Sequence, residues 1–171
     1  LRELDRELSS PNQVTLPSGG RDCTAEVCLS IENVNTGAGT LDIFMENSEG
    51  VAGFQFDVDG VTVTGASGGT ADDAGLATST DPNTVLGFSF TGGVIPAGSG
   101  VLTTISFSDV SGAICFAEQD CSTGACSNEV SDAYNQPVDT DWGCCYGEEE
   151  DCNGVCDGDW VVDDCDDCVD P

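Results

Sequence analysis

Oxygen-bearing side chains recur at short intervals in the stretch DCNGVCDGDWVVDDCDDC, near the end of the sequence. They belong to Asp151, Asn153, Asp157, Asp159, Asp163, Asp164, Asp166 and Asp167. Calcium takes about six to eight oxygen ligands in a flexible geometry, and glycine between acidic residues permits a tight loop that directs several oxygens inward. A divalent cation also relieves the mutual repulsion of clustered carboxylates. This pattern predicts a calcium site; the alternative is a disulfide-stapled acidic linker without metal.

The chain contains 11 cysteines and no histidine. The cysteines are Cys23, Cys28, Cys115, Cys121, Cys126, Cys144, Cys145, Cys152, Cys156, Cys165 and Cys168. A zinc site would need cysteine alone or cysteine with aspartate, so disulfides formed in an oxidising compartment are the better interpretation. We therefore predict an extracellular or cell-surface protein, with a loop at residues 119–128 stapled by Cys115, Cys121 or Cys126. The odd number leaves one thiol that is free, bonds another chain, or pairs beyond the end of this sequence.

The charge balance is strongly acidic. Asp and Glu number 32 against 3 for Lys and Arg, and the formal net charge is -29. The cations are Arg2, Arg6 and Arg21, all near the N-terminus. Such a surface repels nucleic acid and anionic membranes, and no apolar run of about 18 residues suits a membrane span. We therefore expect neither nucleic-acid partners nor membrane insertion.

The sequence holds no set of residues suited to catalysis. Asp57 and Asp59 point outward from one expected strand, but no histidine, lysine or activated nucleophile accompanies them. Asp72 and Asp73 lie in a glycine-rich loop and are weak candidates for a cation. No glycine-rich stretch has the phosphate-loop pattern with lysine. We therefore expect a protein that is not an enzyme.

Strand-like alternation organises the middle of the chain. Apolar and polar side chains alternate in residues 54–58, and the alternation resumes in residues 61–64. Period-two alternation of aromatic and β-branched residues is typical of a half-buried strand. Asp59-Gly60 between two such runs predicts a short β-hairpin.

Further short strands are expected along the rest of this region. They fall near residues 26–32, 41–46, 76–79, 85–90, 101–107, 113–116 and 129–134. In the run 85–90, the side chains of Leu86, Phe88 and Phe90 share one face. Many short strands separated by turn residues, without a long helix in this region, predict an all-β fold, an antiparallel β-sandwich or jelly roll.

The two ends of the chain differ from this region. Leucine spacing in residues 1–10 predicts a short amphipathic helix. Residues 11–20 read as an extended arm in which Val14 and Leu16 alternate, a pattern that can add a strand to a neighbour's sheet edge; a disordered leader is the alternative. We expect an N-terminal arm at 1–22, a β-sandwich at 23–135 and an acidic Cys-rich segment at 136–171.

The acidic segment is too polar to fold around a core of its own. Residues 139–171 hold 13 acidic residues and 6 cysteines and no cation, so disulfides and metal would have to order them. Trp142, Tyr146 and Trp160 form a miniature core there or stack on a sugar or a partner; both interpretations remain open.

Two segments carry a resemblance to a known family. They are LDIFMENSEGVAGFQFDVDGVTVTGASGG (41–69) and VLGFSFTGGVIPAGSGVLTTISF (85–107), with the GFQF strand and the IPAGSGVL turn as the most telling features. They resemble cohesin-like modules of large secreted and surface proteins, which share a broad sandwich class with many carbohydrate-binding modules. The likeness spans about residues 26–134. It implies a cohesin-like sandwich and, as ligands, a dockerin-like protein or a glycan.

The stretch 151–168 is similar to one unit of the calcium-binding type-3 repeats of thrombospondins. The eight oxygen-bearing residues named above occupy the matching positions, and Val155 stands where that pattern would place an oxygen ligand. The resemblance therefore supports calcium as the cofactor.

Together these features predict a non-catalytic extracellular structural protein. In this hypothesis the sandwich is a subunit of a self-assembling surface fibre or adhesin, copies join head to tail by strand addition, and calcium braces them. The alternative is a binding module of a large secreted protein that recognises a protein partner or a glycan.

Overall fold

The computed structural model describes residues 23–124, 126–147, 156, 161–162 and 168–169. The chain divides into two compact units. One is Cys23–Gly147; the other combines Leu1–Asp22 with Glu148–Pro171. In the described part of the second unit, β11 (Val161–Val162) pairs antiparallel with β12 (Cys168–Val169). The helix expected in residues 1–10 and the arm lie outside the described residues.

The first unit is built from short strands and one short helix. They are β1 (Val27–Asn35), β2 (Thr40–Asn47), β3 (Gly53–Asp59), β4 (Thr62–Ser67), α2 (Gly69–Asp73), β5 (Ala77–Thr80), β6 (Thr84–Phe88), β7 (Gly98–Ser108), β8 (Cys115–Phe116), β9 (Glu129–Ser131) and β10 (Thr140–Asp141). No helix in the described part of the chain has the length and apolar character needed to cross a membrane.

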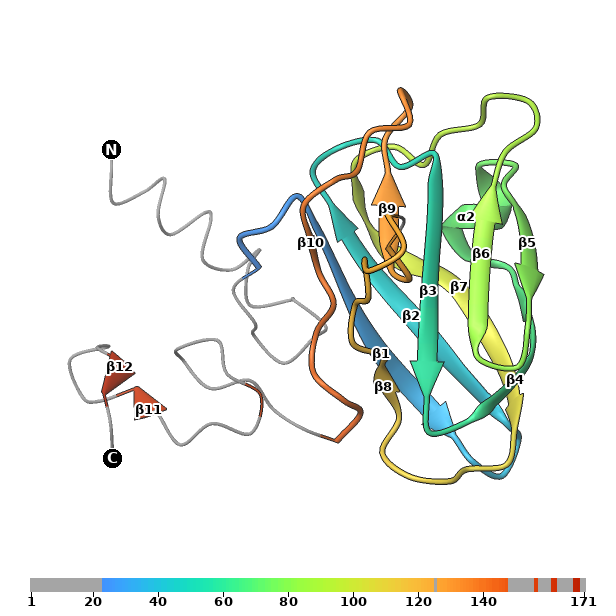
Figure 1. Cartoon of the computed structure of the whole chain (residues 1–171), viewed down its shortest axis with the longest axis vertical. Helices are drawn as coiled ribbons and strands as arrows, with labels where there is room; N and C mark the ends of the chain where they lie inside the picture. The colour runs from blue at the N-terminus through green and yellow to red at the C-terminus, as the bar shows by residue number, and fades with distance from the viewer. Residues whose placement is uncertain (1–22, 125, 148–155, 157–160, 163–167, 170–171) are drawn as a thin grey trace. The chain divides into compact units, whose positions relative to one another are not determined.

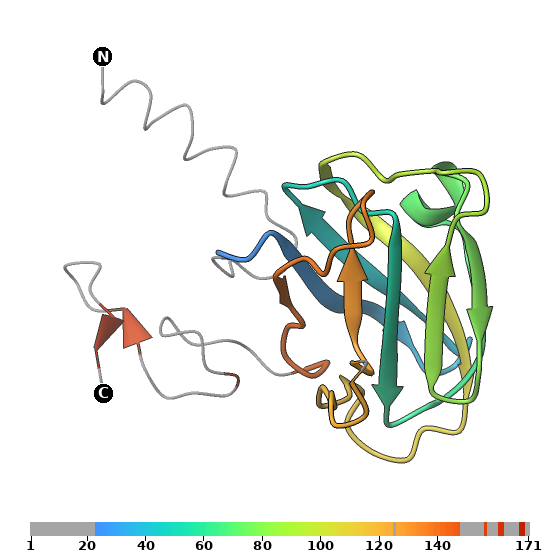
Figure 2. The ribbon, with the colours of Figure 1, turned by 45° about the horizontal axis from the view of Figure 1, so that its top comes forward.

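These strands form two facing sheets (Figures 1 and 2). One sheet has the order β10-β1-β2-β7-β4. The other has the order β5-β6-β3-β8, and β9 also pairs with β3. All pairs in the two sheets are antiparallel except β1 with β10. The predicted all-β antiparallel sandwich is therefore confirmed.

The core lies between the sheets and follows from alternation. In β2, Leu41, Ile43 and Met45 are buried, while the residues between them are half-buried. In β3 on the opposite sheet, Phe54 and Phe56 face the same interior. Burying a large apolar side chain contributes about 1.5–3 kcal/mol, so the inward-facing side chains of each strand help to hold the two layers together.

The predicted hairpin at Asp59-Gly60 is wrong. The strands on either side, β3 and β4, belong to different sheets: β3 pairs with β6, β8 and β9, whereas β4 pairs with β7. The turn is a corner that carries the chain across the core. Gly60 has φ 89°, and a Cβ there would clash with the Ala113 carbonyl oxygen, so glycine is needed at this corner.

Strand β6 presents a different face to the core from the one that its large residues suggest. Val85 is buried, whereas Leu86 and Phe88 are only half-buried. Gly87 faces inward, and a Cβ there would collide with the ring of Phe54. The Phe54 ring of β3 therefore fills the space that a side chain at position 87 would occupy. Leu86 and Phe88, the large residues of β6, lie on its outer face.

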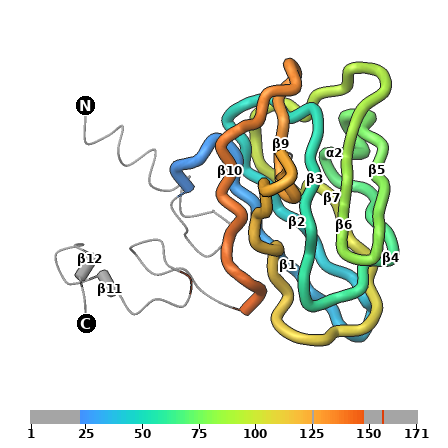
Figure 3. Tube along the Cα trace, viewed as in Figure 1, coloured from blue at the N-terminus to red at the C-terminus, as the bar shows by residue number. Residues whose placement is uncertain are grey.

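Residues 137–147, here called the strap, close one side of the sandwich (Figure 3, orange). The strap first follows β9, where the Val138 N–H donates to the Val130 carbonyl at 2.8 Å. It then follows β1 as β10. A disulfide from Cys115 to Cys145 fastens its far end. The compact unit consequently extends to Gly147, past the boundary that composition suggests at residue 135.

Candidate binding surfaces

The predicted calcium ligands cannot be placed. Asp151, Asn153, Asp157, Asp159, Asp163, Asp164, Asp166 and Asp167 all lie outside the described residues. Among the residues that are described, no group of three or more His, Cys, Asp or Glu side chains could hold a metal ion. The calcium site stays a prediction.

Several cysteines are paired in disulfides. Cys23 pairs with Cys28, Cys115 with Cys145, and Cys121 with Cys126; Cys144 and Cys156 are disulfide-bonded as well. The loop at 119–128 is thus stapled within itself. In that loop, hydrogen bonds from the Ser122 backbone N–H and then from its side chain lower the pKa of Asp120.

One outward carboxylate of β3, that of Asp57, has a structural partner. The Thr84 hydroxyl donates to Asp57 at 2.6 Å, and the Asp57 N–H donates to the amide oxygen of Asn128 at 3.0 Å. Asn128 is fully buried and donates to the Ala117 carbonyl at 2.7 Å. This network joins β3 to β6 and to the loop before β9, so Asp57 has a structural role.

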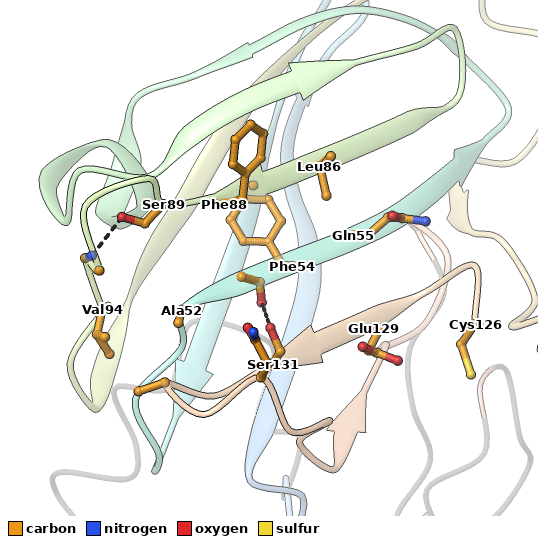
Figure 4. A pocket seen from close by; sticks show the side chains of 16 residues that line it. Ala52, Phe54, Gln55, Leu86, Phe88, Ser89, Val94, Cys126, Glu129 and Ser131 are labelled. Atoms are coloured by element: carbon orange, nitrogen blue, oxygen red, sulfur yellow. Dashed lines mark hydrogen bonds between the residues drawn. The ribbon is translucent and has the colours of Figure 1, made fainter. Parts of the chain in front are cut away.

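A groove of about 460 Å³ lies on the outer side of the sheet that contains β3, β6 and β9 (Figure 4). It is lined by Ala52, Gly53, Phe54, Gln55, Leu86, Gly87, Phe88, Ser89, Gly92, Gly93, Val94, Cys126, Glu129, Ser131, Ala133 and Asn135. Its floor is the backbone of three hydrogen-bonded strands, in which Gly53 pairs with Phe88 on one side and with Ser131 on the other. Because glycine has no side chain, the glycines of the lining leave the space above this floor unfilled.

Polar groups reach the groove from three places. The Gln55 amide nitrogen donates to the Ser127 carbonyl at 3.2 Å, so its amide oxygen remains available. The Ser131 hydroxyl makes only a long contact, 3.5 Å, to the Gly53 carbonyl. Glu129 is the ionisable side chain of the lining. The groove therefore offers both hydrogen-bond donors and acceptors, together with negative charge.

Two exposed aromatic rings belong to the loops beside the groove. Phe90 follows the lining residue Ser89, and Tyr134 lies between two lining residues; each is 83% exposed. The Phe90 ring meets Phe88 edge to face, with centroids 4.8 Å apart. Asp132 accepts the Tyr134 N–H at 2.8 Å and so shapes its loop. Exposed aromatic rings on such loops are candidates for contact with a ligand or a partner.

A second surface is the outer edge of β1. Strand β10 runs beside the first part of β1, with Val27 opposite Thr140 and Cys28 opposite Asp141. Backbone groups alternate along a strand, so those of Ile31 point to the same side as the Val27 N–H, which donates to the Asp139 carbonyl at 3.0 Å. In the described part of the chain, no strand covers residues 30–32 on that side. This edge can accept a strand.

The open edge is short because β1 changes course at its end. Asn33 has φ 50°, and the pairing with β2 shifts between Glu32 and Asn35. The Asn33 amide donates to Asp42 at 2.9 Å and holds the irregularity in place. A bulge of this kind limits how far an added strand can run.

Comparison with known proteins finds similarity among solved structures. No family model matches the chain, and no curated protein matches it. Among solved structures, the chain is similar to a non-cellulosomal cohesin from the hyperthermophilic archaeon Archaeoglobus fulgidus. The identity is 14%, the match covers 68% of this chain and 86% of that one, and the TM-score is 0.47.

Alternation alone does not reveal the groove. The run 85–90 places Leu86, Phe88 and Phe90 on one face, as expected, but that face is the outer one. The sequence signal for this outcome is the pair Val85 and Gly87, which share the opposite face of the strand. That face can be the buried one, because an inward glycine leaves room for an aromatic side chain from a neighbouring strand. The contribution of β9 depends on pairing between residues 53–55 and 129–131, which no local pattern indicates.

Proposed function

We propose that this chain is a non-catalytic, extracellular protein-binding module and that its partner is a second copy of itself. The observation that carries the proposal is the edge of β1 at residues 30–32, which no strand in the described part of the chain covers on its outer side. The disulfides fit an oxidising compartment. An unpaired strand edge offers backbone hydrogen bonds to an extended segment of another chain.

The N-terminal arm is the segment best suited to occupy this edge. Residues 23–147 contain no Lys, Arg or His, so the acidic sandwiches repel one another. The three cations all lie within residues 1–22, which makes the arm the part of the chain least repelled by a neighbour. Its alternating Val14 and Leu16 would face the core beside Ile31. Donation from each copy to the next is a heterologous contact and propagates into a filament.

Deleting residues 1–20 should convert polymers into monomers, as measured by sedimentation velocity and electron microscopy. The double substitution Val14→Pro with Thr15→Pro should have the same effect, because one of two adjacent N–H groups must face the β1 edge. Val14→Ala with Thr15→Ala keeps both N–H groups and is the matched control, which should still assemble. Wild-type protein that is monomeric at all concentrations, or polymers that survive the deletion, would contradict the proposal; the first result would indicate an arm that folds back on its own sandwich.

We further propose that the acidic segment binds calcium and braces the assembly. The support is the density of carboxylates between residues 151 and 167, which suits calcium better than magnesium. Removing calcium with a chelator should loosen the polymers seen by electron microscopy. Asp157→Asn with Asp159→Asn should weaken calcium binding about tenfold or more in a calorimetric titration. If the polymers do not change when calcium is removed and the titration shows no calcium binding, this segment is a disulfide-stapled linker. That result would leave the strand-addition proposal intact.

A further inference from the structure

The groove of β3, β6 and β9 is a surface of a different kind from the β1 edge. Strand β3 is paired on both sides, with β6 at Gly53–Asp57 and with β9 at Gly53–Gln55. Its backbone groups are therefore already used, and an extended peptide cannot add to the sheet here. A ligand in this groove must be recognised by side chains.

The charge of the groove restricts the ligand further. Glu129 is the ionisable lining group, and the sandwich sequence from 23 to 147 contains no cation. A carboxylate only accepts hydrogen bonds, so the ligand must donate to it. An anionic ligand, such as a sulfated or uronate-rich glycan, a phosphate or a nucleic acid, would be repelled.

We propose that this groove binds a neutral saccharide. Sugar hydroxyls both donate and accept, which matches the free amide oxygen of Gln55, the weakly held hydroxyl of Ser131, and Glu129. The C–H faces of sugar rings are apolar and pack against aromatic rings, which Phe90 and Tyr134 present to solvent. The volume of about 460 Å³ lies within the usual range for small-ligand sites.

The two rings can be removed with little cost to the fold. Phe90 and Tyr134 are each 83% exposed, and surface substitutions of this kind change stability little. Tyr146 is a suitable matched control, because it is an exposed aromatic residue, 49% accessible, that does not line the groove. Its side chain should be irrelevant to saccharide binding.

Affinity electrophoresis of the full chain, at a protein concentration below that needed for assembly, tests the proposal. The protein migrates through native gels that contain xyloglucan, mannan, laminarin or dextran, and through gels that contain alginate as an anionic control. At least one neutral polysaccharide should retard the wild type, and alginate should not. Phe90→Ala and Tyr134→Ala should each weaken the retardation constant about fivefold or more, whereas Tyr146→Ala should leave it unchanged.

Three results would overturn the proposal: no retardation by any neutral polysaccharide, equal retardation by alginate, or undiminished binding by the Phe90→Ala, Tyr134→Ala double variant. Sedimentation velocity of the double variant shows whether the groove also takes part in assembly, which we assign to the β1 edge. If the double variant fails to polymerise and no polysaccharide retards the wild type, the groove is a contact between protein chains and the saccharide proposal is wrong.

Discussion

Replacing Cys115 and Cys145 together by serine should lower the free energy of unfolding of the sandwich by about 3–4 kcal/mol, because their disulfide closes a long loop. The two cysteines are 30 residues apart. The bond holds the strap against β8. It also holds Trp142, a residue of the strap, whose ring centroid lies 5.5 Å from that of Phe116. Without it, an unfolded chain gains the loop entropy, and the native strap can detach from both sheets.

Urea denaturation of the oxidised proteins measures this effect. The matched control is Cys121→Ser with Cys126→Ser, which removes a disulfide of sequence separation 5 from an exposed loop. That change should cost about 2 kcal/mol in the same loop-entropy description. Equal losses for the two pairs, or no loss for Cys115 and Cys145, would show that the strap does not depend on its disulfide.

Phe56→Ala should destabilise the sandwich by about 3–5 kcal/mol, the usual cost of removing a large aromatic side chain from a core. Phe56 is fully buried. The centroid of its ring lies 5.8 Å from the ring centroid of Phe54, 5.4 Å from that of Phe116 and 6.2 Å from that of Trp142. The alanine variant loses the buried area and leaves a cavity between β3, β8 and the strap.

Phe90→Ala is the control for this substitution, since it removes the same atoms from a ring that is 83% exposed. Its effect on the free energy of unfolding, measured by urea denaturation, should stay within about 0.5 kcal/mol. Similar losses for Phe56→Ala and Phe90→Ala would contradict the assignment of one ring to the core and the other to the surface. The same Phe90 variant serves the saccharide test, so its stability must be measured first.

The strands themselves could be predicted from local patterns. In β2 and β3 each buried residue is followed by one that is not, and this period of two shows directly in Leu41, Ile43, Phe54 and Phe56. Turn residues between such runs indicated many short strands and hence a sandwich. These features depend on neighbouring residues alone, which is why one sequence suffices to find them.

The pairing of strands could not be predicted in the same way. Asp59-Gly60 suits a hairpin and also suits a corner between two sheets, because both need a residue with positive φ. Both strands bury one face in either arrangement. Only the partners found elsewhere in the chain, β6 for β3 and β7 for β4, decide that the turn is a corner.

The strap and the groove depend on tertiary structure in a similar way. Composition assigns the strap to an acidic tail, but Trp142 packs near Phe56 and Cys145 bonds Cys115, both far away in sequence. Gly87 lies inside the expected strand 85–90, but only the ring of Phe54 packed over it shows why this position is a glycine. The sequence by itself determined the strands, the disulfide-rich character and the absence of cations from the sandwich, since each is a local or compositional property. Tertiary structure decided which sheet each strand joins, which face of β6 is outside and where side chains meet to form a groove, because those depend on contacts between distant residues.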